Sequence, residues 1–102
     1  MQAFRFNVDG KPFESEFSAA PRNLLHAAAI AIYHWPEPEL LKADSVVRID
    51  SHDLLKGGGE VTVDAALKWA LNGEGTTLLE AEACRPLYPL TVIAQRLAIQ
   101  LD

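Results

Sequence analysis

The sequence predicts a single α+β domain over residues 1–102, with one mixed or antiparallel sheet of about four strands and two or three helices packed mainly on one face. Three observations carry this prediction: an N-terminal hairpin pattern, an apolar helical pattern directly after it, and later segments that change between strand and helix periodicity. A length of 102 residues with 49% hydrophobic residues is enough for one core without disulfides or metals.

The opening stretch "FRFNVDGKPFESEF" predicts a β-hairpin. Asp9 and Gly10 form a pair favoured in type I′ turns, because both residue types tolerate positive φ. The turn sets a register with Val8 opposite Lys11, and Arg5 then lies opposite Glu14. The apolar face comprises Phe4, Phe6, Val8, Phe13 and Phe17. A helix is needed to cover that face.

A helix is predicted over "PRNLLHAAAIAIYHW", residues 21–35, where apolar residues recur at helical spacing. Ser18 is the expected N-cap, and Pro21 is acceptable in the first turn. Pro36 ends the helix, because the residue before a proline is pushed out of the α region.

The rest of the chain alternates between the two periodicities. "SVVRID" and "EVTV" read as strands, and Thr62 or Asp64 caps a helix "DAALKWAL" that Asn72 and Gly73 terminate. "TTLLEAEA", residues 76–83, is expected to be a strand with Glu80 and Glu82 on its polar face. The segment "LYPLTVIAQRLAIQL" is expected to be a helix, with a strand as the rival because its start is β-branched.

The stretch "IDSHDLLKGGGE", residues 49–60, holds residue types used in catalysis and phosphate binding. Ser51, His52 and Asp53 are consecutive, so they cannot converge as a catalytic triad. A phosphate loop needs glycines before its lysine, whereas Lys56 precedes the three glycines here. We therefore expect a flexible connection between two elements, with a mobile binding loop as the alternative.

Neither a metal site nor a cofactor is expected. His26 and His34 are eight residues apart on the predicted helix, about 12 Å at 1.5 Å per residue, which is too far for one zinc ion. Both are expected on a solvated or partner-facing surface. Cys84 is the only cysteine, so no intramolecular disulfide is possible, and a buried structural thiol is the commoner role.

Charge indicates the kind of partner. Fourteen acidic and nine scattered basic residues give a net charge of −5, a poor design for gripping nucleic acid, which needs clustered cations. The longest apolar run, residues 27–32, is too short to span a membrane, and the N-terminus does not resemble a signal peptide. We expect a cytoplasmic protein whose partner is a protein with a basic surface, without direct contact to nucleic acid or membrane.

The candidate interaction residues lie in "IYHWPEPELL" and in "TTLLEAEA", residues 76–83. Tyrosine and tryptophan often anchor protein interfaces, and here they are interleaved with prolines and glutamates. The alternative is that Trp35 simply closes one end of the core. The candidate residues are Tyr33, Trp35, Glu37, Glu39, Glu80 and Glu82.

These features favour a non-catalytic protein-binding module, a small acidic inhibitor or antagonist. Chains of this type are frequent among bacterial immunity proteins and phage anti-defence proteins such as anti-CRISPRs, which present carboxylates to a nucleic-acid-binding surface. One alternative is a small enzyme or ligand-binding domain that uses Cys84 and a histidine. Another is a structural subunit of a homo-oligomer, with a homodimer as the simplest form.

Overall fold

In the computed structural model of the chain, the described residues are 2–17, 21–50, 57–83 and 87–100. They form one four-stranded antiparallel sheet, four α-helices and one 3₁₀ turn. The strands are β1 (Gln2–Val8), β2 (Lys11–Phe17), β3 (Val46–Ile49) and β4 (Gly59–Thr62). The helices are α1 (Leu24–Tyr33), η1 (Pro38–Leu40), α2 (Val63–Ala70), α3 (Glu74–Ala83) and α4 (Tyr88–Arg96).

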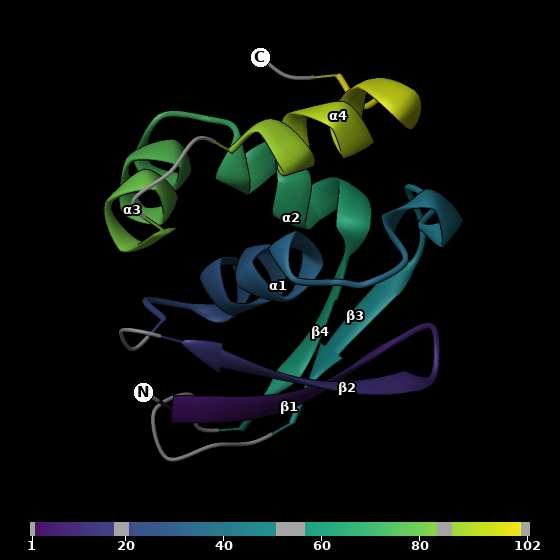
Figure 1. Cartoon of the computed structure of the whole chain (residues 1–102), viewed down its shortest axis with the longest axis vertical. Helices are drawn as coiled ribbons and strands as arrows, with labels where there is room; N and C mark the ends of the chain where they lie inside the picture. The colour runs from purple at the N-terminus through teal and green to yellow at the C-terminus, as the bar shows by residue number, and fades with distance from the viewer. Residues whose placement is uncertain (1, 18–20, 51–56, 84–86, 101–102) are drawn as a thin grey trace.

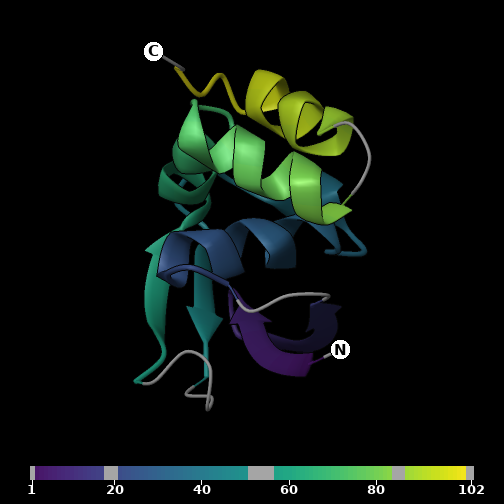
Figure 2. The same cartoon turned by 90° about the vertical axis from the view of Figure 1, so that its left-hand side faces the viewer.

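The sheet has the order β2-β1-β3-β4, and all neighbouring strands are antiparallel. All four helices lie on one side of it, and no described helix covers the other face (Figures 1 and 2). Helix α1 packs against the sheet, α2 packs on α1, and α4 packs on α2. The predicted α+β class is confirmed, although there are four helices instead of two or three.

The hairpin register is as predicted. Val8 pairs with Lys11 and Arg5 pairs with Glu14. The turn residues Asp9 and Gly10 have φ values of 49° and 85°, as a type I′ turn requires. The apolar face of β1 is buried beneath the helices, through Phe4, Phe6 and Val8.

Helix α1 begins later than predicted. Its N-cap is Asn23, whose side-chain oxygen accepts the His26 backbone N–H at 2.8 Å. Ser18, the predicted cap, lies outside the described residues, and Pro21 precedes the helix instead of sitting in its first turn. Seven consecutive residues, 26–32, are buried because the sheet covers one side of the helix and α2 covers another.

The predicted strand over residues 76–83 is wrong, because these residues belong to helix α3. Leucine, alanine and glutamate are good helix formers and are depleted or neutral in strands. Contacts with α2 decide the outcome. The Thr76 hydroxyl donates to the Ala70 carbonyl at 2.8 Å, and Leu79 is buried in the core.

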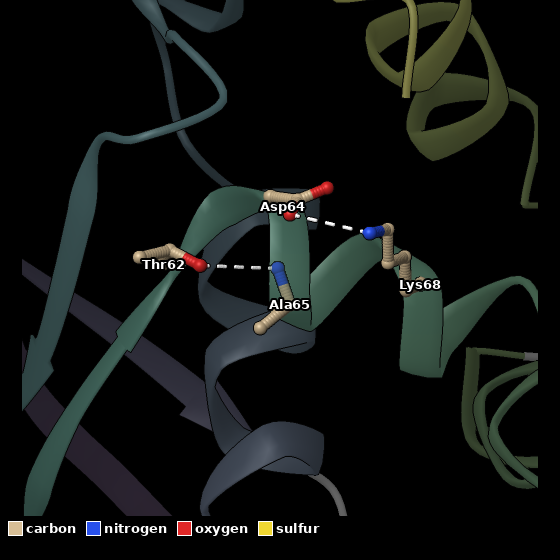
Figure 3. Close-up of polar contacts among 4 residues, drawn as sticks. All are labelled: Thr62, Asp64, Ala65 and Lys68. Carbon is tan, nitrogen blue, oxygen red and sulfur yellow. Dashed lines mark hydrogen bonds and ion pairs between the residues drawn. The ribbon is translucent and has the colours of Figure 1, made fainter. Parts of the chain in front are cut away.

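Thr62, one of the two predicted candidates, is the N-cap of helix α2. The Thr62 hydroxyl accepts the Ala65 N–H at 3.1 Å, and Asp64 instead pairs with Lys68 at 3.4 Å (Figure 3). The C-terminal segment is a helix, as expected, although it ends at Arg96.

The glycine-rich stretch joins β3 to β4, two paired neighbours in the sheet. Gly57, Gly58 and Gly59 all have positive φ, at 87°, 57° and 150°, a region that side chains rarely adopt. The expected connection between two strands is therefore confirmed at its glycine end. Ser51, His52 and Asp53 lie outside the described residues.

Candidate functional site

An open groove of about 450 Å³ lies between the end of α1, the turn η1 and helix α4. The volume falls within the range of roughly 300–1,000 Å³ that is typical of ligand pockets. Its walls are largely apolar and include three aromatic side chains. The lining residues are Ile32, Tyr33, Trp35, Pro38, Glu39, Tyr88, Pro89, Val92, Ile93 and Arg96.

The chain turns back at the end of α1 and forms one wall of the groove. His34 caps the helix, and the Trp35 N–H donates to the Ile32 carbonyl at 3.1 Å. This turn directs Trp35 into the core, where it is 8% exposed and meets the Phe13 ring edge-on at 5.5 Å. Trp35 therefore closes one end of the core and also lines the groove.

Arg96 ties the two walls together. Its Nη2 atom donates to the Pro38 carbonyl at 2.7 Å and to the Leu41 carbonyl at 3.0 Å. Pro38 is the first residue of η1 and Leu41 directly follows the turn, so a side chain of α4 holds both ends of η1. A groove with walls fixed in this way loses little conformational freedom when it binds.

Large apolar side chains are exposed along the groove. Tyr88 is 71% exposed and Val92 is 40% exposed, one helical turn apart on α4. Leu40 on η1 is also exposed, although it does not line the groove. Aromatic side chains that remain accessible beside a concave apolar surface are typical of protein-binding sites.

Carboxylates lie on the η1 side of the groove. Glu39 lines it, and Glu37 lies at the start of the turn, with its carboxylate 4.0 Å from the Lys11 ammonium. Within the described part of the chain, the Glu39 carboxylate has no ion-pair partner. The groove therefore combines an apolar floor with the Glu39 carboxylate and the Arg96 guanidinium at its η1 edge.

Four of the six predicted interaction residues come together here, since Tyr33, Trp35 and Glu39 line the groove and Glu37 adjoins it. Glu80 does not join them. It is exposed on α3, which lies on the opposite side of the molecule from η1 (Figures 1 and 2). The side chain of Glu82 lies outside the described ones.

The α4 wall was missed by sequence reasoning. Tyr88, Val92 and Arg96 are spaced four residues apart, on a different side of the helix from the buried Leu90 and Ile93. An exposed tyrosine and valine on one stripe of a predicted amphipathic helix were the available signal.

Trp35 has one unusual feature. Its Nε1 is buried and finds no hydrogen-bond acceptor among the described residues. A buried N–H without an acceptor costs stability, and most buried indole N–H groups have one.

The two histidines that the structure describes, His26 and His34, lie in different surroundings. His26 was expected on the surface, but it is only 4% exposed. Its Nδ1 accepts the Arg22 N–H at 2.9 Å, and its ring lies 5.4 Å from that of Trp69. His34 is exposed, as expected, and Cys84 and His52 lie outside the described residues. Across the described ranges, no group of three or more histidine, cysteine or acidic side chains is placed to hold a metal ion.

Comparison with known proteins returns no matching family, no matching curated sequence and no matching solved structure. Among the described helices, none is both long and apolar enough to cross a membrane.

Proposed function

We propose that this chain is a non-catalytic protein-binding module, a small acidic antagonist that docks on a macromolecular target through the groove between α1, η1 and α4. The observation that carries this proposal is the exposure of Tyr88 and Val92 beside an apolar groove whose far edge carries the carboxylate of Glu39, which has no ion-pair partner among the described residues.

The chemistry of the groove supports a protein partner. Tyr33 and Tyr88 offer accessible aromatic area with few rotatable bonds, which is the property that makes aromatic residues frequent interface anchors, whereas Trp35 is mostly buried. The net charge of −5 favours a target with a basic surface and accelerates the encounter. Such a target includes a nucleic-acid-binding protein, and the antagonist would then be of the immunity-protein or anti-CRISPR type, acting in the cytoplasm.

The test compares two valines that have similar exposure and lie on different faces. Val92 is 40% exposed in the groove, and Val46 is 36% exposed on β3, outside the groove. The partner is captured from cells of the source organism with the wild-type chain, identified by mass spectrometry and purified. Its dissociation constant is then measured with the double variant Tyr88→Ala/Val92→Ser and with the control Val46→Ser.

We expect the groove variant to weaken binding tenfold or more, about 1.4 kcal/mol, and the control to change it less than twofold. Affinity should also fall as salt is raised, because opposite charges across the interface are screened. Equal affinities for the two variants would contradict the proposal. The mass in solution provides a second check. If the wild-type protein is a dimer and the groove variant is a monomer, the groove is occupied by a second copy of the chain, which would also contradict the proposal.

A further inference from the structure

We infer that the groove takes a lysine or arginine side chain of the partner, an inference that rests on the proposed protein-binding function. Such a side chain has two parts, an apolar stem and a cationic end, and the groove offers a separate surface for each. The proposal concerns one side chain of the partner and leaves the rest of its interface open.

The apolar lining suits the stem. Pro38 on one wall, Val92 on the other and the buried Ile93 between them present aliphatic surface. The methylene groups of lysine or arginine can lie along such a surface while the charged end stays near water. The open form of the groove gives the charged end that access.

The aromatic and acidic groups suit the cation. Tyr33, Trp35 and Tyr88 all line the groove, and aromatic rings attract cations. Glu39 adds a carboxylate that has no ion-pair partner among the described residues. A purely apolar occupant would leave the Glu39 carboxylate without a partner and would remove water from around it, which costs free energy.

Arg96 is the one cation in the lining, and its role is to hold the wall. Its Nη2 donates to the carbonyl oxygens of Pro38 and Leu41, which holds the guanidinium against η1 without removing its charge. Among the described residues no ion pair joins Arg96 to Glu39, so the Glu39 carboxylate remains available to a cation from the partner.

The test uses three acetylated and amidated tripeptides that differ only in the central residue, which is arginine, leucine or glutamate. Each is titrated into the ¹⁵N-labelled full chain, and the amide signals are followed by NMR. We expect the arginine peptide to shift the signals of Tyr33, Glu39 and Val92 and to bind more tightly than the other two. Leucine or glutamate peptides that bind as tightly as the arginine peptide would overturn the inference.

Two variants separate the contributions. Glu39→Gln should lower the affinity for the arginine peptide roughly twofold to fivefold, as expected for the loss of an exposed ion pair. The control Glu80→Gln should leave this affinity unchanged. Tyr88→Leu keeps apolar area but removes the aromatic ring. It should therefore lower the affinity for the arginine peptide and leave the affinity for the leucine peptide unchanged. An unchanged arginine affinity in Glu39→Gln would overturn the inference.

The same variants distinguish this inference from the proposed function. If the protein partner is lost with Tyr88→Ala/Val92→Ser but is retained at full affinity by Glu39→Gln, the groove binds the partner and the cationic occupant is wrong. If neither variant lowers the affinity for the partner, the proposed function itself is wrong.

Discussion

Asp9 and Val46 are joined by two hydrogen bonds, one in each direction. The Asp9 N–H donates to the Val46 carbonyl at 3.0 Å, and the Val46 N–H donates to the Asp9 carboxylate at 2.9 Å. The residue that shapes the hairpin turn therefore also fixes the start of β3. The neighbouring Ser45 carbonyl accepts the Val63 N–H at 2.9 Å, so the same corner reaches the first turn of α2.

Asp9 should make stability depend on pH. The Val46 N–H, and after it the Ser45 hydroxyl, hold the pKa of the Asp9 carboxyl below its ordinary value. A lowered pKa in the folded state means that the ionised form stabilises the fold. This contribution is present above the unfolded pKa, near pH 4, and is lost as the pH falls through the lower folded value.

The variant Asp9→Asn isolates this charge, because asparagine also tolerates the φ of 49°. We expect it to lower the free energy of unfolding at neutral pH by at most about 1 kcal/mol, since water screens the exposed group. Urea unfolding from neutral pH downward should show that the difference from wild type shrinks below about pH 4. A difference that stays constant over this range would contradict the assignment.

The two polar contacts at the start of α2 should contribute differently to the free energy of unfolding. Thr62→Ala removes the hydroxyl that accepts the Ala65 N–H, and loss of an N-cap costs about 1 kcal/mol. Lys68→Ala removes only an exposed ion pair with Asp64 and should cost less than about 0.5 kcal/mol. Urea unfolding of both variants measures the difference, and an equal loss in both would refute it.

Gly75 should tolerate substitution less well than Gly10. A Cβ at this position would meet the Trp69 carbonyl oxygen and lie 2.8 Å from the carbonyl carbon, so α2 and α3 would have to move apart. We expect Gly75→Ala to destabilise the fold by about 2 kcal/mol or more. Gly10→Ala is the control: its φ is +85° but nothing lies within 4 Å, so only backbone strain of about 1 kcal/mol is expected. A milder effect at Gly75 than at Gly10 would show that the α2–α3 contact is loose.

Removing the Arg96 donors should loosen η1 selectively. Arg96→Met keeps the stem of the side chain but leaves the Pro38 and Leu41 carbonyls without the guanidinium, at a cost of about 1 kcal/mol. Hydrogen exchange should accelerate at the Leu40 and Leu41 amides, which close the turn. The control Arg48→Met, on an exposed arginine of β3, should leave these rates unchanged, and equal exchange in wild type and Arg96→Met would contradict the bracing role.

The hairpin could be predicted from the sequence in full detail. Asp9 and Gly10 specify the turn, and the alternation on each side specifies which residues face the core, so every pairing from Val8–Lys11 outward follows. The information lies within fewer than twenty residues because the contacts are local. The cap of α2 and the glycine connection were predictable for the same reason.

Residues 76–83 show where local information ends. Leu79, Glu80 and their neighbours fit an alternating pattern as well as a helical one. The helix and strand propensities of single residues are too weak to decide between the two. Packing against α2 selects the helix, through the close approach of Gly75 to Trp69 and the hydrogen bond from Thr76 to Ala70.

The sequence by itself determined the α+β class, the hairpin and the aromatic-acidic segment that supplies one wall of the groove. Only the tertiary structure decided that α4 supplies the other wall, because Arg96 and Pro38 are 58 residues apart and their contact leaves no periodic signal in either segment. Tertiary packing also moved Glu80 away from Glu37 and Glu39, since α3 docks on α2 at the far side of the fold. Local patterns specify which face of each element is apolar, whereas the burial of all those faces together specifies which surfaces meet.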